Sequence, residues 1–167
     1  SRSKAMWKFI VTSVPLSNPK GGTLLIPGND SWARGSDGTG FLTELRAITG
    51  AIQARAIRNV VWLAGDVHYP EVHAYDADAD GVVDFYEFIS GPLSARAGTP
   101  VAPNQDLHPT TLYSAGGFAN FGVIRVAGGS LRLVIIDDTG QERFSKTFEA
   151  DTRQATSLEK TRERPVP

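Results

Sequence analysis

The pattern of apolar and polar positions predicts a strand, a helix and a second strand in the first 64 residues. Trp7–Val14 is rich in β-branched and aromatic residues, and Pro15 closes it. Between Phe41 and Ala56, apolar residues recur at spacings of three and four, with Thr39 as an available N-cap, which predicts one amphipathic helix. Val60–Ala64 is almost continuously apolar, as in a strand that is covered on both faces. These segments predict a βαβ unit with a right-handed crossover.

The pattern changes to antiparallel hairpins in the second half of the chain. Residues 98–111 have no period and are predicted to form a loop. Phe121–Val126 and Leu131–Ile136 are predicted strands joined by Gly128-Gly129, and Arg143–Phe148 is a third strand. Residues 151–167 are polar and end in Arg-Pro-Val-Pro, which predicts a disordered or loosely attached tail after a domain of residues 1–150. We therefore expect an α/β fold in which antiparallel hairpins follow the βαβ unit, as a mixed sheet or a pair of sheets.

Asp66 and His68 form the first candidate site, because they follow the apolar strand Val60–Ala64 directly. Gly65 lets the chain turn, and open α/β sheets bind ligands just beyond the carboxyl ends of their strands. If the chain is extended here, side chains two residues apart point the same way and converge. A carboxylate and an imidazole suit zinc, manganese or iron. The alternative is a turn aspartate that caps the next segment, beside a surface histidine.

A second candidate site is an acidic segment that matches the calcium-binding loop of an EF-hand at every named position. The flanking sequence does not match, because residues 69–75 read as extended chain and Pro92 stops any exiting helix. A calcium loop without helices and a solvated acidic hairpin turn both remain open. The matching residues are Asp76, Asp78, Asp80, Gly81, Asp84 and Glu87.

Several single residues are further candidates. Glu71 and His73 lie close enough to His68 in sequence to support it, although Pro70 disturbs the register. His108 is predicted to lie on the surface. Three residues could form a substrate rim, although the tryptophan could instead pin a loop to the core and the arginine could simply be solvated. These three are Asp30, Trp32 and Arg96.

Composition narrows the classes of partner and chemistry. The 167 residues carry 17 basic and 18 acidic side chains, so no global field indicates nucleic acid or an anionic membrane. The absence of cysteine excludes disulfides, cysteine-ligated zinc and a thiol nucleophile. No stretch approaches the roughly 20 apolar residues of a transmembrane helix.

Six segments carry a further signal through their order and spacing. They are Trp7-Lys8-Phe9, residues 13–17, Asp30-Ser31-Trp32, residues 59–69, residues 85–95 and residues 118–122. Together they resemble the PhoD-like alkaline phosphatase and phospholipase D family of metallophosphoesterases, over about residues 5–150.

The resemblance implies the mixed-sheet portion of an αββα sandwich and the hydrolysis of phosphate monoesters or diesters by a metal-bound hydroxide. It implies Asp66 and His68 as ligands of iron, calcium, manganese or zinc, and Glu87 as a weaker ligand or neighbour of the site. A protein like the family would be exported. The family's earlier motifs have no counterpart in this chain, which resembles the C-terminal half and would need an upstream segment for catalysis. A non-enzymatic calcium-binding module at residues 76–87 and an inactive scaffold half are the alternatives.

Overall fold

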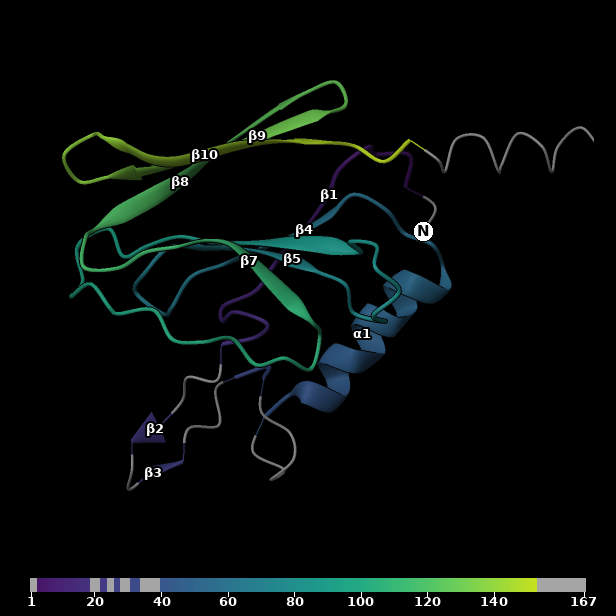
Figure 1. Ribbon diagram of the computed structural model, residues 1–167, viewed down its shortest axis with the longest axis horizontal. Coiled ribbons are helices and arrows are strands. Elements are labelled where there is room, and N and C mark those ends of the chain that lie inside the picture. Colours follow the sequence, from purple (N-terminus) through teal and green to yellow (C-terminus); the bar gives the residue numbers. More distant parts are fainter. Residues whose placement is uncertain (1–2, 19–21, 24–25, 28–30, 34–39, 153–167) are drawn as a thin grey trace, which may run out of the picture.

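Two β-sheets and one helix are stacked in three layers (Figure 1). A three-stranded sheet packs on one face of a five-stranded sheet, and helix α1 lies on the opposite face. The computed structural model describes residues 3–18, 22–23, 26–27, 31–33 and 40–152. The mixed α/β fold expected from the sequence is confirmed.

The five-stranded sheet contains the predicted βαβ unit and has the strand order β1-β4-β6-β5-β7. β1, β4 and β6 are parallel, whereas β5 runs antiparallel to β6 and to β7. The carboxyl ends of β4 and β6 and the start of β5 therefore meet at one edge of the sheet. The strands are β1 (Lys8–Val11), β4 (Val60–Ala64), β5 (Glu71–Tyr75), β6 (Phe85–Ile89) and β7 (Pro109–Ser114).

Helix α1 (Leu42–Ala54) crosses over between β1 and β4. It buries Leu42, Leu45, Thr49 and Ile52, which share one face because their spacing follows the helical period. The N-cap position is Phe41, which makes no side-chain capping bond, and Thr39 lies outside the described residues.

Helix α1 ends at Ala54, two residues before the predicted end at Ala56. Ala56 takes the left-handed φ of 46°. Its N–H donates to the Gln53 carbonyl, and the Ile57 N–H donates to the Ile52 carbonyl. This is the Schellman arrangement that closes helix C-termini.

The antiparallel hairpins form a separate sheet with the order β10-β9-β8. β8 (Asn120–Ala127) turns into β9 (Ser130–Asp137) through Gly128, whose φ is 58°, and β10 (Glu142–Glu149) follows. All three predicted strands are confirmed. A short pair, β2 (Gly22–Thr23) and β3 (Ile26–Pro27), lies apart from both sheets (Figure 1).

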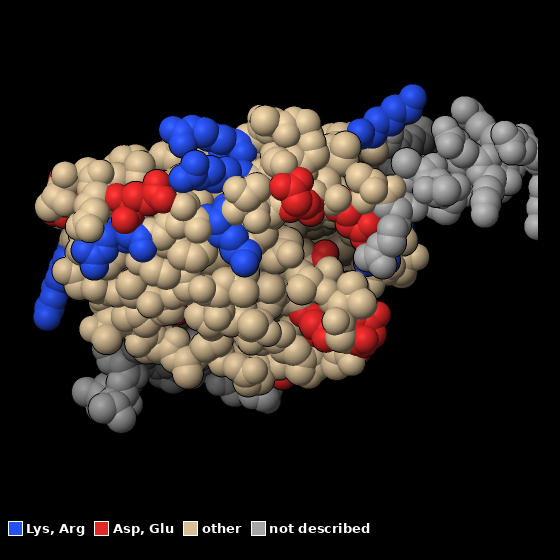
Figure 2. All heavy atoms as spheres, turned by 45° about the horizontal axis from the view of Figure 1, so that its top comes forward, with Lys and Arg blue, Asp and Glu red and all other residues tan. Residues whose placement is uncertain are grey.

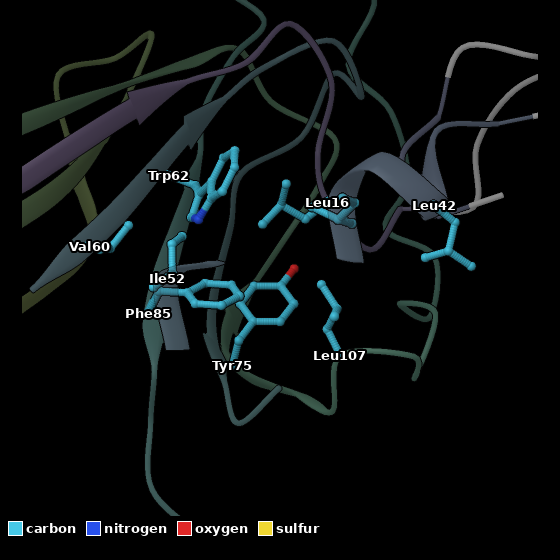
Figure 3. Packing of buried hydrophobic residues seen from close by; sticks show 9 residues of the cluster. Leu16, Leu42, Ile52, Val60, Trp62, Tyr75, Phe85 and Leu107 are labelled. Atoms are coloured by element: carbon cyan, nitrogen blue, oxygen red, sulfur yellow. The ribbon is translucent and has the colours of Figure 1, made fainter. Parts of the chain in front are cut away.

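The core has two larger parts, one on each face of the five-stranded sheet, and a small third cluster of Val67, Tyr69 and Ile89. Val60 and Trp62 of β4 belong to the part beneath α1, and Val61 belongs to the part beneath the three-stranded sheet. Both faces are therefore covered, which explains why β4 lacks polar residues. In Figure 3, Tyr75 and Phe85 stack beneath Trp62 and Leu16, with ring centroids of the stacked pair 5.1 Å apart.

Strand β7 differs from the sequence prediction. The predicted loop at residues 98–111 is wrong at its end, because β7 begins at Pro109. β7 is a partly exposed edge strand, so neither burial nor hydrophobic period marks it.

Of the predicted tail, residues 153–167 lie outside the described residues. The backbone N–H of Asp151 donates to the side chain of Asn59, and the Asp151 carbonyl accepts from the same side chain. In the part of the chain that is described, no helix is long and apolar enough to span a membrane.

Candidate functional site

Asp66 and His68 lie in a tight turn directly after β4. Their φ angles are 71° and 65°, so the extended geometry expected from the sequence is wrong. The Val67 N–H donates to the Gly65 carbonyl at 2.9 Å, which tightens the turn. Val67 and Tyr69 point into the core, whereas Asp66 and His68 are both exposed at the carboxyl edge of the sheet. The two candidate ligands therefore share this edge because a turn exposes them.

The imidazole of His68 is held by the backbone of Arg96. Nδ1 of His68 lies 2.9 Å from the Arg96 carbonyl oxygen. A carbonyl can only accept, so this hydrogen bond requires the proton on Nδ1 and leaves the lone pair on Nε2. Metal-binding histidines commonly have their second nitrogen held in this way. The side chain of Arg96 is exposed.

The segment that carries Arg96 is attached to β8 and to the turn. The Asn120 side chain donates to the Gly91 carbonyl at 2.7 Å and accepts from the Gly91 N–H at 2.9 Å. The Gly98 N–H donates to the His68 carbonyl at 2.7 Å. Sequence reasoning did not single out Asn120. A lone asparagine beside Phe121 at the start of an apolar strand was the available signal, because a buried amide needs specific partners.

A stripe of buried polar side chains runs along β5. Glu71, His73 and Tyr75 alternate onto the face beneath α1, which settles the register after Pro70. His73 Nε2 lies 3.3 Å from a Glu71 carboxylate oxygen, and Ser114 donates to the other oxygen at 2.8 Å. Nothing in the described chain links Glu71 or His73 by a hydrogen bond to Asp66 or His68.

Glu87 is separated from the acidic loop. It is fully buried in β6, where one carboxylate oxygen accepts from the Leu16 N–H at 2.8 Å and the other accepts from the Tyr75 hydroxyl at 2.6 Å. Burial raises the pKa of this carboxyl, while the Tyr75 and Leu16 bonds oppose the shift. The prediction that Glu87 completes a calcium loop is therefore wrong in this structure, since both oxygens face the core.

The acidic segment itself forms the connection between strands β5 and β6, so an EF-hand is excluded. Carboxylate oxygens of Asp76, Asp78 and Asp84 lie within 4.8 Å of one another. Asp76 accepts from two backbone amides of the turn, and Asp84 accepts from the Ala77 N–H and from Gln53. Burial raises the pKa of the Asp84 carboxyl. Asp80 accepts from the Val82 N–H and lies outside the group.

The remaining candidates are spread over the surface. Trp32 donates to the Thr12 hydroxyl at 2.8 Å and meets Phe41 edge-on, as expected for an aromatic that pins a loop. Asp30 lies outside the described residues. His108 is exposed, with Nδ1 3.2 Å from the Asp76 carbonyl oxygen. Figure 2 shows basic and acidic side chains together on the viewed face, in agreement with the net charge of −1.

Comparisons with known proteins agree with the resemblance seen in the sequence. The family model described as PhoD-like phosphatase matches residues 1–126. No curated protein matches the chain. A solved structure described as "Structure of PhoD" superimposes with a TM-score of 0.66 at 16% sequence identity, which shows the likeness of fold. The match covers 90% of this chain but 31% of that structure, so the chain spans less than a third of its length. The chain belongs to the PhoD-like phosphatase family.

Proposed function

We propose that this chain forms part of a metal-dependent hydrolase of phosphate monoesters or diesters, in which Asp66 and His68 are metal ligands. The observation that carries the proposal is the geometry of His68. Its Nδ1 is held by the Arg96 carbonyl, so Nε2 is exposed with a free lone pair at the carboxyl edge of β4, beside the exposed Asp66.

The chemistry of the donors fits a metal. One hard carboxylate and one neutral imidazole suit iron, manganese or zinc better than calcium, which prefers oxygen ligands alone. In the described part of the chain, no hydrogen bond or ion pair involves the Asp66 carboxylate. Metal ions bound here would activate water and neutralise charge on the phosphoryl oxygens.

The residues of this chain would have distinct tasks around such a site. Arg96 orients His68 through its backbone carbonyl. The side chain of the same residue is exposed and carries a guanidinium group. A planar guanidinium can bind a phosphate through two parallel hydrogen bonds. Arg96 therefore supports binding of an anionic ester next to His68.

The ligand set also indicates that the site is shared with another segment. Two protein ligands do not complete a two-metal centre, which takes several carboxylates and imidazoles. In the described residues, no third carboxylate or imidazole forms a metal-binding group with Asp66 and His68. We infer that an upstream segment of the same domain supplies the others, since the chain spans 31% of the PhoD structure.

A second candidate function is calcium binding by the acidic loop. The oxygens of Asp76, Asp78 and Asp84 are close enough to share an ion. Their bonds to the turn's own backbone also support the simpler role of stabilising the β5–β6 connection.

One experiment separates the two functions in the longest natural protein that contains this chain. Metal content and hydrolysis of p-nitrophenyl phosphate and its bis ester are measured for Asp66→Asn, His68→Ala and Asp76→Ala, with calcium titrated in parallel. The phosphoesterase proposal expects the first two variants to lose metal and about 100-fold or more in turnover. Asp76→Ala should then affect calcium binding alone.

His108→Ala is the matched control for His68→Ala. His108 is also exposed, also has a positive φ, and also has Nδ1 next to a backbone carbonyl. Alanine therefore meets similar backbone strain at both positions. Unchanged turnover and metal content in Asp66→Asn and His68→Ala would contradict the phosphoesterase proposal.

A further inference from the structure

We propose that Asn120 is a positioning residue for His68: by holding Gly91 and Pro92, it keeps the Arg96 carbonyl on Nδ1 and so keeps Nε2 free. The importance of Nε2 for a metal rests on the proposed function. The effect of Asn120 on the imidazole does not, and it can be measured without a metal.

Asn120 grips the start of the segment at three points. Its side-chain amide exchanges two hydrogen bonds with the backbone of Gly91, and its own N–H donates to the Pro92 carbonyl at 2.7 Å. The side chain is 2% exposed, so water does not compete for these bonds. Asn120 pairs with Asp137 in the three-stranded sheet. Its three hydrogen bonds therefore attach residues 91–92 to strand β8.

The middle of the segment has no other support. Among the described residues, positions 93–97 take part in a single hydrogen bond, in which the Arg96 carbonyl accepts from Nδ1 of His68. The side chains of residues 93–96 are exposed, so packing does not fix them. The position of the Arg96 carbonyl is therefore set from the two ends of the segment.

The far end is fixed against the turn itself. The Gly98 N–H donates to the His68 carbonyl, and the Gly98 carbonyl accepts from the Gly117 N–H. A Cβ atom at Gly98 would lie 2.9 Å from the Val67 carbonyl oxygen, so the two backbones are in close contact. With this end held at the turn, Asn120 holds Gly91 and Pro92 at the other end, directly after the last link of that end to β4, the Ser90 N–H bond to the Ala64 carbonyl at 3.3 Å.

The consequence concerns the tautomer of His68. While Arg96 accepts from Nδ1, the proton stays there and Nε2 offers its lone pair to the edge of the sheet. If the segment moves, Nδ1 loses its acceptor and the proton is free to occupy Nε2. That tautomer cannot bind a metal through Nε2.

The test identifies the protonated ring nitrogen directly, by long-range ¹H–¹⁵N correlation NMR at mildly alkaline pH. The chain has three histidines, so the signals can be assigned by substitution. In the unaltered protein, His68 should be protonated on Nδ1. In Asn120→Asp, which keeps the shape but cannot donate to the Gly91 carbonyl, the Nδ1-protonated fraction should fall by about half or more.

Asn59→Asp is a close control. Asn59 makes the same pair of bonds, at 2.7 and 3.0 Å, to the backbone of Asp151. It does so before β4, whereas Asn120 and His68 lie beyond its carboxyl end. The control should leave His68 unchanged, and the buried His73 should keep its signals wherever the fold is intact.

Three results would overturn the proposal: His68 protonated on Nε2 in the unaltered protein, His68 unchanged in a folded Asn120→Asp variant, or equal changes in both variants. If Asn120→Asp does not fold, the smaller Asn120→Ser replaces it, and the measurement on the unaltered protein still decides the tautomer. In the longer protein, the proposed function adds a loss of about 10-fold in metal affinity for Asn120→Asp. A changed tautomer with no metal binding in any variant would reject the proposed function and leave the positioning role standing.

Discussion

Glu87 is the buried carboxyl that joins the chain after β1 to the centre of the sheet. Its two oxygens accept hydrogen bonds from the Leu16 N–H and from the hydroxyl of the buried Tyr75, which also interacts with Ser17. An unpartnered buried donor costs roughly 1–3 kcal/mol. Glu87 therefore stabilises the loop in which Leu16 enters the core beneath α1.

The raised pKa of Glu87 predicts how stability depends on pH. The folded carboxyl keeps its proton at pH values above 4.5, the ordinary pKa of glutamate. The folded state therefore binds more protons than the unfolded state there, and the free energy of unfolding falls as pH rises through the folded pKa. His73 and Tyr75 of β5 face this group, and the Tyr75 bond lowers its pKa. Urea denaturation from about pH 5 to about pH 8 should show a flatter dependence for Glu87→Gln and a steeper one for Tyr75→Phe. The same slope in all three proteins would contradict this assignment.

The sequence located Asp66 and His68 but could not give their geometry. An apolar strand followed by Gly-Asp-Val-His indicates a site, yet whether residues 66–68 are extended or turned depends on what Val67 and Tyr69 pack against. Glu87 matched a calcium loop by spacing alone, and only the three-dimensional partners of its oxygens assign it to the core. The only local signal for Asn120 is a lone asparagine at the start of an apolar strand, because its side chain binds Gly91, 29 residues away.

At the scale of elements, two residues in and after α1 do not suit their backbone conformation. Alanine would favour the helix at position 50 more than glycine does, and glycine would tolerate the positive φ at position 56 better than alanine does. Gly50 lies in an exposed turn of the helix, with nothing within 4 Å of an added Cβ. Ala56 holds the left-handed position that closes the helix.

Exchanging these two residue types should stabilise the protein. We expect Gly50→Ala and Ala56→Gly each to raise the free energy of unfolding by about 0.5–1 kcal/mol, the first by helix propensity and the second by relief of the positive φ. Urea denaturation of both single variants and of the double variant measures this. The same substitution at Gly98, Gly98→Ala, is the contrasting control for Gly50→Ala and should be destabilising because of the contact with Val67. Destabilisation by Ala56→Gly would contradict the closing role assigned to residue 56.

Elements with a clear period or a continuous apolar run could be predicted from the sequence. Helix α1 has the helical period, β4 is continuously apolar, and the three hairpin strands are separated by turn residues; the structure contains each of them. β5 has neither signal, because its five buried residues include Glu71 and His73. Its polar residues are satisfied by Thr111 and Ser114 of β7, a strand whose own period is too weak to be recognised.

At the scale of the whole molecule, β1 is an open edge of the five-stranded sheet. Among the strands that the structure describes, it pairs with β4 alone, and its Phe9 and Val11 are 42% and 78% exposed. Unpaired strands with exposed apolar residues readily pair with other chains. This is the edge at which we would expect a further part of a PhoD-like domain to continue the sheet.

A single charge at this edge should therefore change the behaviour of the isolated chain. We expect Val11→Lys to reduce self-association, seen as a smaller particle size in light scattering at equal concentration. Leu93→Lys is the control, because Leu93 is similarly exposed, at 75%, but lies in a loop. If both variants reduce association equally, exposed apolar area rather than the open edge is responsible.

The two hydrogen bonds between the Asn59 side chain and the Asp151 backbone affect how the protein unfolds under force. They fasten the backbone just after β10 to the residue just before β4, 92 positions away in the sequence. A force that pulls on the chain beyond Thr152 would load these two hydrogen bonds before it reached any rung of β10. An unfoldase that pulls on the C-terminal end would thus act first on the start of β4 in the larger sheet, and β10 would separate from β9 only after these two hydrogen bonds had broken.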